Sequence, residues 1–252
     1  MAKKVTNAST IGYMPEDTPP LPAMLSLGFQ QVLTMFPATV LVAILTKFDV
    51  GVTLFTSGLG TIIALLVAKR KIPLYYGSSF SYITVFITVM AKYAGDCFND
   101  PSTVYCPDGV RIAQVGILLT GLFNILFGLL IQWIGKARLD KVLPPIVTGS
   151  VAIVIGIALA GTALAQSSAH WGVAFFTLVC TIVFSVYLQG KGLLGMLPIL
   201  LGAVAGYLLS LAVGIVDFSP VGEAAWVRLP NFTLPAFGDA RAWGMALSVA
   251  LI

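Results

Sequence analysis

The residues with the clearest capacity for chemistry lie in one short stretch, residues 72–82, and there the backbone itself supplies the functional groups. Pro73 lacks an N–H and disfavours helical geometry at the residue before it. Gly77 allows backbone paths that other residues avoid. Ser78 or Ser79 can then cap a helix that follows. The first turn of such a helix leaves N–H groups free, and these can donate hydrogen bonds to an acceptor on a ligand.

Membrane-spanning segments must position this stretch. The chain has 252 residues, of which 58% are hydrophobic and 10% are charged, whereas a soluble domain is about 25% charged. A span needs roughly 20 apolar residues. Seven segments qualify, at residues 24–46, 51–68, 74–91, 112–134, 144–165, 170–188 and 193–213. The sequence therefore predicts an all-α polytopic membrane protein.

The third of these segments is short, and its composition changes halfway. Residues 74–76 suit an extended chain, which covers more distance per residue than a helix does. Inside a bilayer, non-helical backbone is tolerated only where protein surrounds it or where it lines a cavity. Broken spans of this kind mark the substrate sites of secondary transporters. We predict a third span that is part strand and part helix, with a ligand site at the junction.

The two ends of the chain differ in character. Residues 1–22 lack an apolar core and contain four prolines, so they indicate a polar tail and not a signal peptide. An eighth apolar run occupies residues 242–252, which is too short to cross a bilayer. We interpret this run as the truncated start of span 8, and the chain as the front portion of a longer protein. Seven spans followed by a new one are also what the first half of an inverted repeat looks like.

Loop charges predict the orientation. The tail and the loops after spans two, four and six carry nine Lys and Arg residues, and the opposite loops carry five. The opposite loops also hold seven of the ten acidic residues. Because positive charge favours the inner side, we expect a cytoplasmic N-terminus and an external linker at residues 214–241.

The same orientation bears on the three cysteines. Cys97 and Cys106 flank a loop that the charges place outside, where disulfides persist. We therefore predict a bridge between them; two free thiols are the alternative. Cys180 lies in an apolar span and is expected to be inert.

Several classes of function conflict with these patterns. The basic residues sit in short loops and leave no basic face for nucleic acid. A membrane enzyme would need acids, bases or metal ligands within its spans, and no Asp, Glu or His lies away from the span ends. A seven-helix receptor or retinal protein would place its N-terminus outside. We therefore expect neither an enzyme nor a metal or cofactor site.

Four blocks of sequence occur in a familiar order. Residues 27–42 read LGFQQVLTMFPATVLV, and residues 71–80 read KIPLYYGSSF. Residues 144–156 pair Pro-Pro with a later Val-Ile-Gly, and residues 214–230 open with Gly-Ile-Val-Asp. These blocks resemble the nucleobase–cation symporter-2 family, the uracil and xanthine permeases, and the resemblance extends from Pro19 to the end of the chain.

The resemblance implies an architecture and an activity. Members have fourteen spans in two inverted sets of seven, divided into a core domain and a gate domain. Residues 23–143 would then belong to the core, and residues 144–213 to the gate. The implied function is uptake of uracil or a xanthine-type base across the cytoplasmic membrane by alternating access, coupled to protons in preference to sodium, in a homodimer. Two key glutamates of the family lie in spans eight and ten, which this chain does not contain in usable form.

The resemblance also nominates site residues. Phe80 aligns with the position whose backbone amide meets the base, and Ala38 with a first-span residue that lines the site. The full candidate set is Gln31, Ala38, Tyr76, Gly77, Ser78, Ser79 and Phe80. Gln31 stands where the family usually has histidine, and Pro37 where it has glycine, which leaves the identity of the base open. The alternative function is anion transport by the related sulfate and bicarbonate carrier fold, which would want a positive charge near the third-span helix start.

Overall fold

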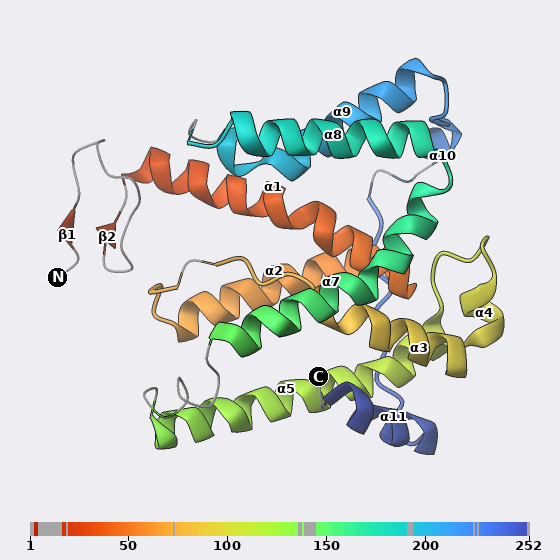
Figure 1. The fold of residues 1–252 in the computed structure, drawn as a ribbon. Helices are drawn as coiled ribbons and strands as arrows, with labels where there is room; N and C mark the ends of the chain where they lie inside the picture. Colours follow the sequence, from red (N-terminus) through yellow and green to blue (C-terminus); the bar gives the residue numbers. More distant parts are fainter. Residues whose placement is uncertain are drawn as a thin grey trace. The chain divides into compact units, whose positions relative to one another are not determined.

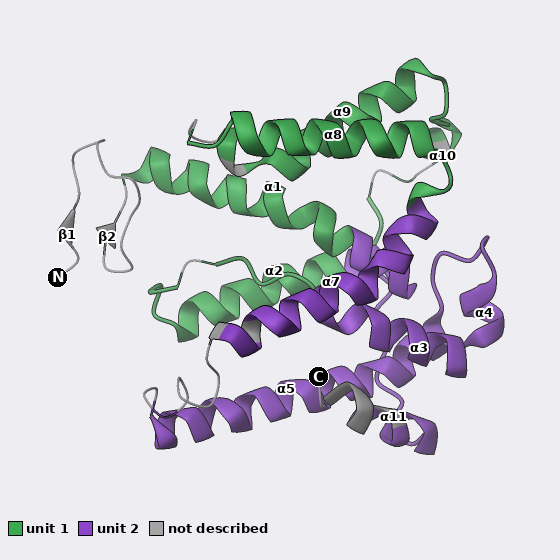
Figure 2. Ribbon diagram, in the orientation of Figure 1, with its two compact units in different colours: residues 1–40, 53–78, 167–229 green, residues 41–52, 79–166, 230–252 purple. Residues whose placement is uncertain are grey.

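The computed structural model describes residues 3–4, 17–18, 20–72, 74–135, 138, 145–190, 194–223, 225 and 227–250. These residues are predominantly helical (Figure 1). The chain divides into two compact units, which are treated separately below (Figure 2). The first unit comprises residues 1–40, 53–78 and 167–229, and the second comprises residues 41–52, 79–166 and 230–252.

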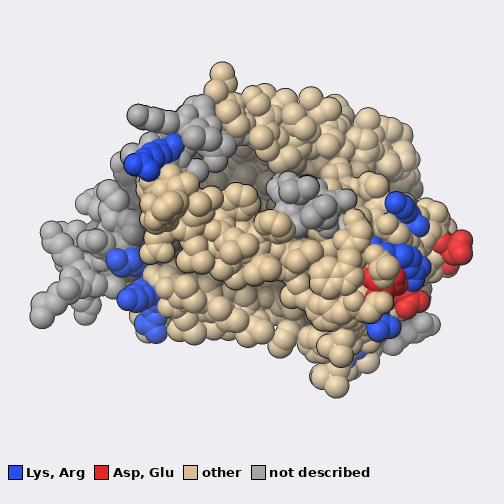
Figure 3. Space-filling view, turned by 90° about the horizontal axis from the view of Figure 1, so that it is seen from below, with Lys and Arg blue, Asp and Glu red and all other residues tan. Residues whose placement is uncertain are grey.

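The long helices agree closely with the predicted spans. They are α1 (Leu21–Thr46), α2 (Val50–Val67), α5 (Pro107–Ile134), α7 (Pro145–Ser167), α8 (Trp171–Tyr187) and α9 (Pro198–Ala212). In the described part of the chain, α1, α2, α5 and α7 contain segments long and apolar enough to cross a membrane, while α8 and α9 are shorter apolar helices. These are the helices of a polytopic membrane protein, and charged side chains cover little of the surface drawn in Figure 3.

The third predicted span changes conformation halfway, as its sequence indicates. Residues 74–79 are neither helix nor strand, the 3-10 helix η1 covers Phe80–Tyr82, and α3 covers Ile83–Tyr93. The expectation of a strand needs correction, because residues 74–79 pair with no other strand in the described part of the chain. We call residues 74–79 the arm.

In the second unit, α5 packs against α11 (Ala240–Ala250), and α3 contacts both helices. The buried cluster at this contact consists of Phe86, Val89, Ile112, Ala113, Val115, Ala242 and Ala246. A second cluster joins Met90, Cys106 and Val110. A Cβ atom at Gly109 would lie 2.7 Å from the Cβ atom of Ala94, so the start of α5 can approach the end of α3 only because residue 109 has no side chain.

The linker before α11 is fixed to the same unit. Arg111 accepts a hydrogen bond from the N–H of Ala236 at 2.9 Å through its carbonyl oxygen. The side-chain amide of Gln114 donates to Oγ1 of Thr233 at 3.0 Å. Part of the segment predicted as an external linker is therefore ordered against α5. Two short helices, α4 (Gly95–Asn99) and α10 (Ser219–Glu223), were not predicted.

In the first unit, α8 and α9 lie side by side (Figure 1). Gly202 and Gly206 of α9 meet Thr181 and Thr177 of α8, and a Cβ atom at either glycine would overlap the facing threonine hydroxyl. The spacing Gly-x-x-x-Gly thus gives close packing of α9 on α8. The 3-10 helix η2 (Leu194–Met196) precedes α9.

The polar tail contributes only two short strands to the described residues. Strands β1 (Lys3–Lys4) and β2 (Asp17–Thr18) pair in parallel, with Lys3 opposite Asp17. The predicted division into core and gate parts, at residues 23–143 and 144–213, is not the division into the two units. The predicted domains stay a prediction.

Candidate functional site

The arm is held from one side by α2. The N–H of Tyr76 donates a hydrogen bond to Oγ1 of Thr61 at 2.9 Å. The Thr61 hydroxyl in turn donates to the carbonyl oxygen of Ser57, one helical turn earlier, at 2.7 Å. The Thr61 hydroxyl therefore donates its hydrogen bond within α2, and its oxygen accepts a hydrogen bond from the arm.

The arm is held from another side by α1. A Cβ atom at Gly77 would lie 2.9 Å from Cε of Met35 and 3.0 Å from Oγ1 of Thr39. Thr39 is fully buried, and its hydroxyl donates to the carbonyl oxygen of Met35 at 3.0 Å. Gly77 is thus needed for a close approach between the arm and this turn of α1.

Two candidate residues lie on α1 near that contact. Ala38 belongs to the turn between Met35 and Thr39, and Gln31 lies one turn before Met35, on the same side of the helix. α1 continues through Pro37, which has no N–H to donate to the helix. The neighbouring Gln30 is buried, and its side-chain Oε1 has no hydrogen-bond partner among the described residues.

The arm ends in a helix start with free donors. Ser79 is the N-cap residue, with extended backbone angles (φ −91°, ψ 130°), but its hydroxyl makes no capping bond. Within the described residues, the backbone N–H groups of Ser78, Ser79 and Phe80 make no hydrogen bond. Phe80 is 39% exposed. Several backbone donors at one helix start can bind a carbonyl or anionic oxygen.

The structure brings some of the predicted residues together. Gln31, Ala38, Tyr76, Gly77 and Ser78 belong to the first unit, where Gly77 contacts the turn that contains Ala38. Ser79 and Phe80 belong to the second unit, and there they begin the helix that continues into α3. Sequence reasoning missed Thr61, Met35 and Thr39. Nothing in the sequence singled out Thr61, because α2 also contains the hydroxyl residues Thr53, Thr56 and Ser57.

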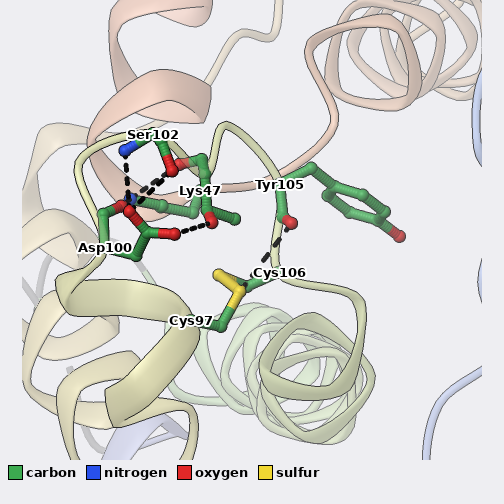
Figure 4. The surroundings of a disulfide bond; sticks show 7 residues. Lys47, Cys97, Asp100, Ser102, Tyr105 and Cys106 are labelled. Carbon is green, nitrogen blue, oxygen red and sulfur yellow. Dashed lines mark hydrogen bonds between the residues drawn. A yellow bond between two sulfur atoms is a disulfide. The ribbon is translucent and has the colours of Figure 1, made fainter.

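A second group of polar contacts lies in the loop before α5, within the second unit (Figure 4). Cys97 and Cys106 form a disulfide, the bridge predicted from the sequence, with their Cα atoms 5.9 Å apart. The ammonium of Lys47 donates to the carbonyl oxygens of Asp100 and Thr103 at 2.6 and 2.7 Å. The N–H of Cys106 donates to the carbonyl oxygen of Lys47 at 3.1 Å.

The carboxylate of Asp100 organises the same loop. It accepts hydrogen bonds from the hydroxyl and the N–H of Ser102, at 2.7 and 2.9 Å, and from the hydroxyl of Thr103 at 2.8 Å. The hydroxyl of Ser102, then that of Thr103, and with a smaller effect the charge of Lys47, lower the pKa of Asp100 to about 2. The described residues contain no group of three His, Cys, Asp or Glu side chains that could hold a metal ion.

Comparison with known proteins assigns the family. The family model described as "Permease family" (Xan_ur_permease) matches residues 22–252, nearly the whole chain. The chain belongs to this permease family. The resemblance to the nucleobase–cation symporters, drawn from four short blocks, is thereby confirmed.

Curated members of the permease family are similar to the chain over most of its length. The uracil permease of Bacillus caldolyticus is 41% identical over 233 residues, which cover 89% of this chain and 50% of that protein. The uracil permease of Bacillus subtilis (strain 168) is 38% identical over 265 residues, covering 100% and 56%. That of Escherichia coli (strain K12) is 33% identical over 232 residues, covering 88% and 50%. The chain spans about half the length of these relatives.

Proposed function

We propose that this permease takes up a nucleobase, uracil or a xanthine-type base, across the cytoplasmic membrane by cation symport. The observation that carries the proposal is the helix start after the arm, where the N–H groups of Ser78, Ser79 and Phe80 are free in the described part of the chain. The arm that leads to these donors is tied to α2 through Tyr76 and packed on α1 through Gly77. The names of the relatives, uracil permeases, support the choice of ligand.

The chemistry of a base fits these donors. Uracil has two carbonyl oxygens, which accept hydrogen bonds, and two ring N–H groups, which donate them. Backbone N–H groups at a helix start serve the carbonyls without bringing a charge that repels or traps the ligand. The exposed ring of Phe80 offers a flat apolar surface beside the same donors.

The ring N–H groups of the base need acceptors of their own. We propose that carboxylates provide them, as the family resemblance implies for glutamates of the eighth and tenth spans. Protonation removes the negative charge of a carboxylate and changes which hydrogen bonds it can make. Proton binding and base binding at such a group therefore influence each other, and this coupling would drive symport.

The proposed orientation has a cytoplasmic N-terminus, with the disulfide loop outside. We also propose that this half pairs with a second, inverted half of seven spans, and that the complete permease forms a homodimer.

Uptake measurements test the function. Cells that lack uracil uptake of their own would express the complete gene product and receive labelled uracil, with unlabelled uracil, xanthine or sulfate as competitors. We expect uracil or xanthine to compete and a protonophore to abolish accumulation, whereas replacing external sodium has no effect. If removal of external sodium abolishes accumulation and the protonophore does not, the coupling ion is sodium and not the proton. Labelled sulfate uptake without base uptake would overturn the proposal in favour of an anion carrier.

A further inference from the structure

The arm has few bonds of its own. Within the described residues, residues 74–78 donate one hydrogen bond to a backbone acceptor, from the N–H of Leu74 to the carbonyl oxygen of Ile72 at 3.0 Å. A segment with neither helical nor sheet hydrogen bonds takes its position from side chains. The contacts of Tyr76 and Gly77 therefore decide where the arm lies.

One side-chain hydrogen bond fixes the arm along its length. Oγ1 of Thr61 accepts the N–H of Tyr76, immediately before Gly77. Because the Thr61 proton is directed to Ser57, the lone pair that faces Tyr76 is held in a set direction. Thr61 lies inside α2, so a regular helix sets the position of this acceptor.

Gly77 supplies the complementary constraint. A Cβ atom at residue 77 would lie only 2.9 and 3.0 Å from atoms of Met35 and Thr39, so the arm can lie this close to α1 because residue 77 is glycine. Two adjacent residues are thus fixed by different means, one by a hydrogen bond to α2 and the next by close packing on α1. The free N–H of Ser78 follows directly in the chain.

We propose that Thr61 is a positioning residue for substrate binding, which acts through the arm and does not touch the substrate. This inference rests on the proposed function. When the hydroxyl is absent, the N–H of Tyr76 loses its partner and the arm can shift or rotate. The N–H donors that follow the arm would then be misplaced for a base. The affinity for the base would fall, while the maximal rate of transport would change little.

Three variants of the complete gene product test the role. Thr61→Val keeps the shape and removes the acceptor, and Thr61→Ser restores it. Thr88→Val is the matched control, because the Thr88 hydroxyl is exposed and donates only to Thr84, within its own helix, at 2.8 Å. The readouts are the KM and maximal rate of uracil uptake, normalised to the amount of protein in the membrane by immunoblot, and the thermal unfolding temperature in detergent.

We expect Thr61→Val to raise KM about tenfold with less than about a twofold change in maximal rate, the effect of losing one hydrogen bond. Thr61→Ser should remain within about twofold of wild type, and Thr88→Val should match wild type. If Thr61→Val lowers only the amount of protein or the unfolding temperature, or if its KM equals that of Thr88→Val, the positioning role is wrong. If the wild type takes up no base at all, the proposed function fails instead, and the two results are distinguishable.

Discussion

The ammonium of Lys47 lies 2.6 Å from the backbone carbonyl oxygen of Asp100, 53 residues further along the chain. It lies 2.7 Å from that of Thr103 as well. Lys47 thereby ties the end of α1 to the disulfide loop (Figure 4), and the N–H of Cys106 completes the link by donating to Lys47. The side chain of Lys47 thus holds the loop at two carbonyl oxygens through charge-assisted hydrogen bonds. Its backbone carbonyl oxygen adds a neutral hydrogen bond from Cys106.

Replacing Lys47 with Met should destabilise the second unit. The variant keeps an apolar stem and loses both hydrogen bonds from the ammonium, so we expect a loss of about 1–2 kcal/mol in the free energy of unfolding. Thermal unfolding of purified protein in detergent measures it. Lys92→Met is the control, since the Lys92 ammonium lies over the ring of Tyr93, 5.1 Å from its centroid, and makes no hydrogen bond to a carbonyl oxygen within the described residues. Equal unfolding temperatures for the two variants would contradict a special role for Lys47.

Removing the disulfide should also destabilise the protein. A bridge with a sequence separation of 9 residues restricts the unfolded chain, and its loss through Cys97→Ser with Cys106→Ser should cost roughly 2–3 kcal/mol. Within residues 1–252, alkylation of denatured protein before reduction should label one thiol, Cys180, and alkylation after reduction should label three. Labelling of three thiols without reduction would show that the bridge does not form in the cell.

The side of the membrane can be tested on the same loop. We expect a membrane-impermeant reductant, applied to intact cells, to expose Cys97 and Cys106 to an impermeant maleimide, because the loop is proposed to face outside. Cys180 lies within α8 and should not react. Labelling that appears only after the cells are opened would place the loop in the cytoplasm and reverse the proposed orientation.

Low pH should destabilise the folded protein by protonating the carboxylate of Asp100. The folded-state pKa is about 2, below the ordinary value of 3.8, so the folded protein binds this proton less tightly than the unfolded chain does. The stabilisation is therefore complete above about pH 4 and is lost as the pH falls toward 2. Comparison of wild type with Asp100→Asn should show a difference in unfolding temperature at pH 6 that shrinks between pH 4 and 2. A difference that stays constant over this range would contradict the assignment.

Close packing between α8 and α9 predicts that the effects of Gly202→Ala and Thr181→Ala on stability are not additive. Gly202→Ala would place a methyl group on the hydroxyl of Thr181, and relieving the overlap should cost about 1–3 kcal/mol. Adding Thr181→Ala removes the hydroxyl and should restore part of the loss, because the Cβ atom of residue 181 still lies 2.9 Å from the new methyl group. Gly161→Ala is the control, because a Cβ atom there has no neighbour within 4 Å. If the double variant is no more stable than Gly202→Ala alone, the overlap is not the cause.

Much of the architecture was predictable because its signals are local. Apolar length gave the six long helices, and Pro73 and Gly77 indicated a non-helical arm that ends at the helix start of Phe80. The partners of the arm were not predictable, since Thr61 and Met35 reach it only through the tertiary fold. The sequence of residues 74–79 indicates an extended chain but does not show whether that chain pairs with a strand. The prediction of a strand was wrong because residues 74–79 pair with none among the described residues.

The end of α1 carries a further consequence. Lys47 adopts the left-handed conformation (φ 54°), and the N–H of Phe48 donates back to Ala43 at 2.9 Å, so a lysine fills the place where helices commonly end in glycine. That conformation costs a residue with a Cβ atom about 1–2 kcal/mol. Lys47→Gly should therefore be milder than Lys47→Met, because it removes the ammonium and the torsional penalty together. The difference in the free energy of unfolding between Lys47→Gly and Lys47→Met would measure the backbone strain that accompanies a lysine at the end of α1.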